Sequence, residues 1–113
     1  MNLTPHPVTL AIEGRDPLEI APSGAVARCT TGREPLGEMR IEPHGVAIPI
    51  VRSTLGGVDG LPDPTEGAAF VVSRVVAEAA ARSLARTADL FFPEDPVRDE
   101  AGRIVGCRTL ARL

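Results

Sequence analysis

The chain has 113 residues, of which 43% are hydrophobic and 24% are charged, and these proportions exclude a disordered chain. The formal net charge of −3 excludes a protein that holds duplex nucleic acid on a basic surface. All 12 basic side chains are arginine. Their planar forks suit bidentate binding of phosphate or carboxylate, although a GC-rich genome produces the same bias.

Prolines and glycines divide residues 1–70 into short extended segments, a pattern that favours strands and turns over helices. We expect a hairpin around Gly14, because glycine adopts the positive φ that such turns require. The strands predicted in this part of the chain lie at 7–13, 17–21, 25–30, 38–43 and 46–55.

Two features limit how these strands can pair. Pro49 has no amide proton, so the run 46–55 is expected to be an edge strand or to contain a bulge. The segment 31–37 is polar, and it is expected to connect two strands. The segment 56–67 is rich in glycine and proline, and we predict that it is a surface loop.

The C-terminal part contains the one predicted helix. Residues 68–72 form a short apolar run, which indicates a buried strand. Ser73 is a suitable N-cap for a helix over 74–86, where apolar residues recur with helical period and charged residues pair at i,i+4. A hairpin with its turn at 99–102 is expected to close the chain at 96–113.

This order of elements predicts an α+β fold. We expect a single β-rich domain over residues 1–113, with an antiparallel β-sheet and one main helix packed on the sheet. With only three aromatic residues, the core must be built from aliphatic side chains, and a homo-oligomer would bury further apolar surface. The chain shows no leader pattern and no run of 18 apolar residues, so a cytoplasmic protein outside membranes is expected.

Residues capable of catalysis or metal binding are few and scattered. Cys29 and Cys107 are expected to be buried free thiols, with a disulfide between them left open. His6 and His44 have no close metal-ligand spacing with them, and no nucleophile or phosphate-binding motif is present. We therefore predict a protein without enzyme activity, cofactor or metal.

Strand alternation singles out three arginines on otherwise apolar faces. Arg52 continues the apolar face of the strand at 46–52, and Arg28 and Arg108 likewise share their faces with aliphatic residues. A charge on a buried face needs a carboxylate, backbone carbonyls or a ligand, because an unpaired buried charge is costly. Both an internal ion pair and a bound anion would meet that need.

The segment 89–100 contains two adjacent phenylalanines before a proline and is predicted to be a loop. Phe91 or Phe92 could stack on a purine or nicotinamide ring while arginine binds the phosphates. Arg98 lies in the same segment and is included among the candidate ligand residues. The alternative is that both rings seal the core beneath the helix.

Five segments carry a resemblance to a known family: NLTPHPV at 2–8, APSGAVAR at 21–28, GLPDPTEG at 60–67, FVVSRVVAEAA at 70–80 and PVRDEAGRIVGCRTL at 96–110. Nearly from end to end, they resemble a family of small bacteriophage and prophage proteins. Small phage proteins of similar size and strand content include the Thoeris anti-defence sponges, which trap cyclic ADP-ribose isomers. The similarity implies a non-enzymatic homo-oligomer that sequesters an anionic nucleotide in the host cytoplasm.

Two functional hypotheses result. The first is an anti-defence sponge for a cyclic ADP-ribose-type or cyclic nucleotide signal, with arginines on the phosphates and Phe91 or Phe92 on the base. The second is a small phage accessory protein without a small-molecule ligand, which pairs with a partner or with itself through the edge strand at 46–52. Neither hypothesis involves duplex nucleic acid or a membrane.

Overall fold

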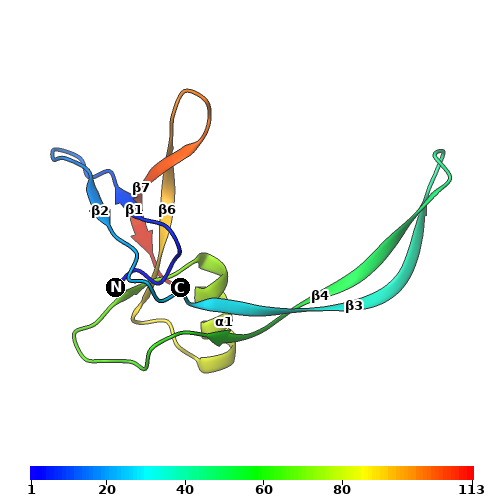
Figure 1. The fold of residues 1–113 in the computed structure, drawn as a ribbon, viewed down its shortest axis with the longest axis horizontal. Coiled ribbons are helices and arrows are strands. Elements are labelled where there is room, and N and C mark those ends of the chain that lie inside the picture. Colours follow the sequence, from blue (N-terminus) through cyan, green and yellow to red (C-terminus); the bar gives the residue numbers. More distant parts are fainter.

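A long two-stranded arm stands out from a small body in this protein (Figure 1). The computed structural model describes all of residues 1–113. Its elements in chain order are β1 (Val8–Leu10), β2 (Leu18–Ile20), β3 (Arg28–Ile41), β4 (Val46–Asp59), β5 (Phe70–Val71), α1 (Arg74–Leu84), β6 (Leu90–Arg98) and β7 (Ile104–Ala111). The arm is the β3–β4 hairpin, and the longest extent of the molecule is 56 Å. The predicted α+β class, rich in strand and with one helix, is confirmed.

The body contains a five-stranded sheet in the order β2-β1-β7-β6-β5. The β1–β2 and β6–β7 pairs are antiparallel, as the two predicted hairpins require. The β1–β7 and β5–β6 pairs are parallel, so the sheet is mixed rather than antiparallel throughout. β5 and β6 run in the same direction because α1 crosses over between them, and such a connection brings the chain back to a parallel strand.

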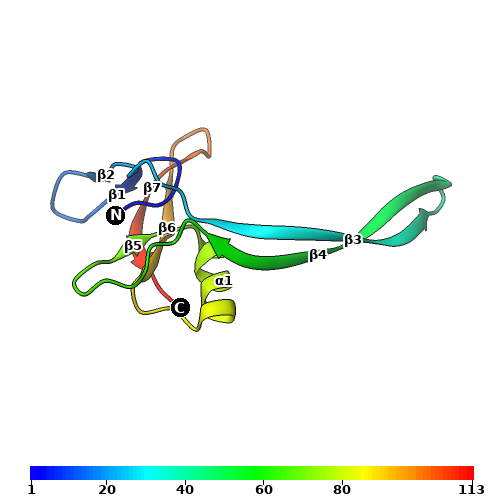
Figure 2. The same ribbon diagram turned by 60° about the horizontal axis from the view of Figure 1, so that its bottom comes forward.

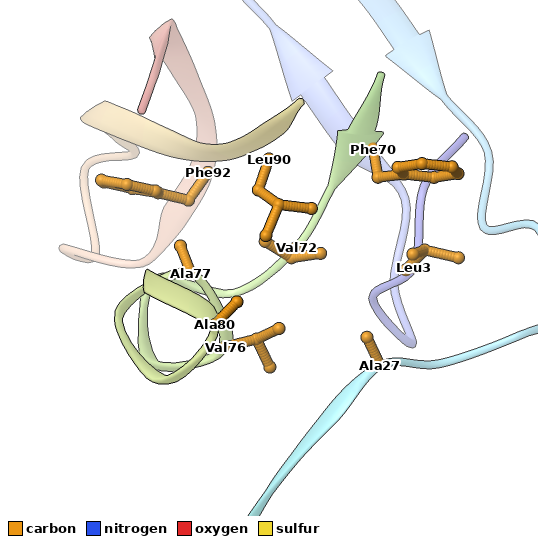
Figure 3. Close-up of a cluster of buried hydrophobic side chains, with 9 residues drawn as sticks. All are labelled: Leu3, Ala27, Phe70, Val72, Val76, Ala77, Ala80, Leu90 and Phe92. Atoms are coloured by element: carbon orange, nitrogen blue, oxygen red, sulfur yellow. The ribbon is translucent and has the colours of Figure 1, made fainter. Parts of the chain in front are cut away.

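The core lies between the body sheet and α1 (Figure 3). Ala77, Ala79 and Ala80 are at most 2% exposed, and their small side chains let the helix approach the sheet closely. The main cluster consists of Leu3, Ala27, Phe70, Val72, Val76, Ala77, Ala80, Leu90 and Phe92. Only 14 of the 113 residues are buried and none of them belongs to β3 or β4, so the arm has no core of its own.

The limits of α1 are set by its caps. Ser73 Oγ accepts a hydrogen bond from the Val76 amide at 3.2 Å, which confirms the predicted N-cap. The helix ends at Leu84 rather than at residue 86. Ala85 adopts the left-handed conformation with a φ of 51°, and this conformation ends the helix.

The strands of the arm differ in extent from those predicted for the N-terminal part of the chain. The segments 25–30 and 38–43, predicted as separate strands, belong largely to the single 14-residue strand β3. The strand predicted at 46–55 extends to Asp59 as β4, so the first residues of the predicted loop 56–67 are in a strand. β4 pairs only with β3 and is an edge strand, as the proline at position 49 predicts.

Glycines allow the arm to continue through these segments. A Cβ at Gly56 would collide with the side chain of Thr30 on the facing strand. A Cβ at Gly32 would lie 2.6 Å from the Thr54 hydroxyl. Glycine at these positions therefore accommodates the cross-strand side chain, whereas from sequence alone it indicates an irregular loop.

Residues 90–95, part of the predicted loop, belong to β6, which continues to Arg98 as the predicted closing hairpin requires. Leu90 and Phe92 are buried in the core, and the intervening Phe91 lies on the other face of the strand. β5 ends opposite Phe91, so beyond this residue β6 has a free edge on one side. The two prolines that follow are tolerated there because a missing amide proton costs little at an edge.

The side chain of Asn2 is 1% exposed and fully hydrogen-bonded. Its Nδ2 donates to the carbonyl of His6 at 2.9 Å and to that of Ile20 at 3.0 Å. Its Oδ1 accepts from the amide of Thr4 at 2.9 Å and from the Thr4 hydroxyl at 2.7 Å. One buried amide therefore closes the N-terminal turn and ties it to the end of β2.

Residue 3 continues this junction through its backbone. The Leu3 amide donates to the Val71 carbonyl at 2.8 Å, and the Leu3 carbonyl accepts from the Ala27 amide at 2.9 Å. Val71 belongs to β5, and Ala27 is the last residue before β3. The N-terminal segment thus links the body sheet to the root of the arm.

Replacing Asn2 with alanine is expected to lower the free energy of unfolding by about 1–3 kcal/mol, because buried polar groups lose their partners. Urea unfolding followed by circular dichroism measures this change. His6→Ala is the matched control, since only the His6 carbonyl is used and the variant retains it. An Asn2→Ala variant as stable as the wild type would contradict the role assigned to this side chain.

A second anchor lies just beyond the end of α1. Arg86 Nε donates to Asp89 Oδ1 at 3.1 Å, and Arg86 Nη2 donates to Asp89 Oδ2 at 2.8 Å. The two side chains are only 11% and 18% exposed, and the guanidinium carbon lies 5.8 Å from the centre of the Phe70 ring. Hydrogen bonding to Arg86 lowers the pKa of Asp89 below its ordinary value.

This pair is expected to contribute to acid sensitivity. Because the pKa of Asp89 is lower in the folded than in the unfolded chain, the pair stabilises the protein above the ordinary aspartate pKa of about 3.9. The contribution is lost as pH falls through the folded value. In urea titrations, the midpoint of the wild type should fall more steeply than that of Asp89→Asn below about pH 4. Parallel curves for the two proteins would contradict this expectation.

Candidate functional site

The three arginines predicted to bind phosphate lie apart. Arg28 begins β3 and is opposite Asp59 across the hairpin. Arg52 on β4 is opposite Glu34, six residues further along β3, which places it about 20 Å from Arg28. Arg108 is on β7 in the body. A single chain therefore does not bring the three side chains to one small ligand.

Two of these arginines have carboxylate neighbours. Arg52 Nη1 lies 3.6 Å from Glu34 Oε2, and Arg108 Nη1 lies 3.7 Å from Asp95 Oδ1. All four side chains are more than half exposed, so the prediction that these arginines continue buried faces is wrong. Ion pairs in such exposed positions contribute at most about 1 kcal/mol.

Phe92 and Arg98 have structural contacts. Phe92 is 3% exposed within the core, and the Arg74 guanidinium carbon lies 5.6 Å from the centre of its ring. Phe91 is partly buried on the other face of β6. Arg98 Nη1 donates to the Gly102 carbonyl at 2.8 Å and fastens the β6–β7 turn. The Phe92 ring is therefore closed to a stacking ligand.

The thiols and imidazoles are not gathered into a site. Cys29 and Cys107 are both free, and burial raises the pKa of the Cys107 thiol. His6 and His44 are exposed. No group of three or more histidine, cysteine, aspartate or glutamate side chains is placed to hold a metal ion.

Three open hollows mark the surface of the body. One of about 270 Å³, between the root of the arm and the start of α1, is lined in part by Arg28, Cys29 and Ser73. Another of about 380 Å³ lies between β1 and the β6–β7 hairpin. The third, of about 530 Å³, lies beside the C-terminal end of α1. Among the predicted ligand residues, only Arg28 lines any of the three.

The outer half of the arm has two chemically different faces. The cross-strand register places five apolar side chains on one face, which we call the apolar arm face: Met39, Ile41, Val46, Ile48 and Ile50. The opposite face carries Glu38 and Arg40, and Arg40 Nε donates to Glu42 Oε1 at 3.1 Å. This is the pattern of an antiparallel sheet with one side on a core and the other in water.

Nothing in the chain covers the apolar arm face. Met39 and Val46 are each 53% exposed, and Ile48 is 43% exposed. Figures 1 and 2 show the outer half of the arm clear of every other element. The apolar arm face is therefore left uncovered by the rest of the chain.

The two edges of the arm are interrupted by prolines. Each strand has a free edge, but β3 contains Pro35 and β4 contains Pro49. Proline lacks the amide proton that an added strand would use. The register also shifts between Pro35 and Gly37, which interrupts the regular ladder of β3. Both edges of the arm are therefore poorly suited to pairing with an added strand.

Three of the five side chains of the apolar arm face can be recognised from the sequence alone. The alternation of valine and isoleucine over 46–50 is visible in the printed sequence. Met39 and Ile41 lie in the strand predicted at 38–43, but this strand is not paired with 46–55 in the sequence-based prediction. The available signal was the alternation of these two residues with charged ones, mirrored across the turn at 42–45, which places them opposite the apolar positions of 46–50.

The only helix, α1, has 11 residues, and no helix of the structure is long and apolar enough to cross a membrane. None of the known protein-family models matches the chain, and no match is found among the curated proteins or the solved structures. A function must therefore be inferred from the geometry of the arm and of the hollows.

Proposed function

We propose that this protein is a small, non-enzymatic assembly protein that binds a protein partner through the apolar arm face. The observation that supports this most is the presence of five apolar side chains on one face of a hairpin that has no core. Exposed apolar surface of this kind, bordered by polar residues, marks interaction sites. The free, amphipathic arm is the largest feature of the fold that the stability of the body does not explain.

The energetics favour a covered arm. Fully burying a valine, isoleucine or methionine side chain contributes about 1.5–3 kcal/mol. The three most exposed members of the apolar arm face retain 43–53% of their accessible area, so covering each adds about 1 kcal/mol. Immobilising a hairpin that already has its bound conformation costs less than ordering a flexible segment. The preformed arm is suited to specific docking.

The resemblance to small bacteriophage and prophage proteins supports an accessory role in a phage assembly, in the host cytoplasm. The proposed contact differs from the edge-strand pairing expected from the sequence, because Pro35 and Pro49 weaken both edges. Docking through a face instead relies on apolar contact and on the shape of the partner surface.

A photo-crosslinking amino acid tests the docking face directly. Placed at Ile48 in the cells that naturally produce the protein, it is expected to form an adduct with a protein. Placed at Ala47, the adjacent residue on the opposite face of β4, it is expected to form far less. The measurement is the mass of each adduct. Equal yields from the two positions, or no adduct from either, would contradict the proposal.

Sequestration of an anionic nucleotide is a second candidate function, which one observation favours. Arg28 has no ion-pair partner and lines the hollow of about 270 Å³ at the start of α1. The N-terminal end of a helix favours negative charge, so an arginine beside it suits a phosphate. Arg52, Arg108 and the two phenylalanines are not among the residues of this hollow, so such a site would use few of the predicted residues.

Thermal unfolding with cyclic nucleotides and cyclic ADP-ribose tests this second candidate. A ligand at one hundred times its Kd should add about 2.7 kcal/mol to stability and raise Tm. The shift should be lost in Arg28→Ala and retained in Arg33→Ala, which removes another arm arginine without an ion-pair partner. An unchanged Tm with every ligand would exclude these nucleotides.

A further inference from the structure

We propose that the partner of the apolar arm face is the body of a second copy of this chain; this inference rests on the proposed docking function. The receiving surface is the hollow of about 380 Å³ between β1 and the β6–β7 hairpin, which we call the body groove. Its lining includes Pro7, Val8, Pro96, Ile104, Val105 and Gly106. The chain thus carries two uncovered apolar surfaces, one projecting and one hollow.

The body groove has the chemistry to receive apolar side chains. Ile104 and Val105 are 60% and 52% exposed, so two branched side chains of β7 are uncovered at this groove. Prolines on both sides contribute apolar, conformationally restricted walls with no amide protons to satisfy. The volume is at the lower end of the range that encloses a small ligand, enough for a small group of side chains.

An arm cannot reach the groove of its own chain. β3 and β4 both contact α1 where the arm leaves the body. Figures 1 and 2 show the arm running from there away from β1 and β7, the strands that border the groove. The apolar arm face lies on the outer half of the arm, away from the body groove of the same chain. Any contact between the apolar arm face and a body groove therefore joins two different molecules.

The distribution of charge favours contact between an arm and a body over contact between two bodies. Residues 28–59 contain four arginines and four carboxylates, and the rest of the chain therefore carries the whole net charge of −3. Two bodies repel one another, whereas a neutral arm and a body do not. The arm is the part of the chain that can approach a second copy without this cost.

Charges beside the two surfaces are also complementary. Arg52 follows Ile50 on the same face of β4, and its ion pair with Glu34 is long at 3.6 Å and exposed. Glu94 lines the body groove and belongs to no ion pair. With the apolar arm face in the groove, Arg52 becomes available to Glu94, and the bidentate geometry of arginine would fix the orientation.

Contact between two arms would leave the body groove of each copy uncovered. The apolar arm face is about 17 Å long and about 10 Å wide, roughly 170 Å². When two copies exchange arms, each contributes an arm and a groove, so the same contact forms twice and both apolar surfaces are covered.

Light scattering after size-exclusion chromatography tests this inference with three variants. Ile48→Glu places a charge on the apolar arm face, and Val105→Glu places one in the body groove. Ala47→Glu is the control, because Ala47 is opposite Arg40 on the polar face. Wild type and Ala47→Glu should have at least twice the chain mass of 11.9 kDa, whereas Ile48→Glu and Val105→Glu should each be monomers.

Mixing identifies the contact. An equimolar mixture of Ile48→Glu and Val105→Glu should regain a species of two chains, because the first has an intact groove and the second an intact arm. If the wild type is oligomeric but the mixture stays monomeric, the arm does not dock in the groove. Circular dichroism melting shows whether each variant folds, and Ile48→Ser or Val105→Ser replaces a glutamate variant that does not.

The oligomer and crosslinking results separate this inference from the proposed function. A wild type that is monomeric at every concentration overturns docking on a second copy. If Ile48 then crosslinks to a different protein, docking through the arm stands and only the identity of the partner is wrong. If Ile48 crosslinks to nothing, the docking function itself fails.

Discussion

The buried, fully hydrogen-bonded side chain of Asn2 is the constraint that holds the body and the arm together. A buried amide must find partners for all its polar atoms, and here they come from the N-terminal turn and from the end of β2. With Asn2 fixed, Leu3 is positioned to bond Val71 in the sheet and Ala27 at the root of the arm. The direction in which the arm leaves the body therefore depends on a buried side chain of the N-terminal segment, next to the residue that bonds the root of the arm.

The parts of the fold that sequence reasoning predicted depend on local signals. The helix follows from its apolar period and the Ser73 cap, and the last hairpin follows from its turn at 99–102. The parallel pairing of β1 with β7 joins Leu10 to Cys107, and no local pattern specifies such a contact. The continuity of the arm was also not predicted, because its glycines indicate loops when read from the sequence. In the structure they leave room for side chains on the facing strand.

The candidate site was less predictable than the fold. Arg28, Arg52 and Arg108 were selected on the premise that apolar alternation means a buried face. In the arm that premise fails, since the alternating face is exposed and no core lies beneath it. The apolar alternation predicted over 46–50 does lie on one face of β4. The residues of that face that suggest a function are its aliphatic side chains, not Arg52 at its end. Whether a face is covered by the same chain depends on tertiary structure.

The two-residue period of the strands determines how the reach of the arm can change. One residue added to each strand would turn the outer faces over and present Glu38 and Arg40 where the apolar side chains now lie. Two residues added to each strand would keep the faces and lengthen the arm by about 7 Å. Variants of this arm can therefore span a set of discrete distances, and the spacing of the surfaces they connect would follow the same steps.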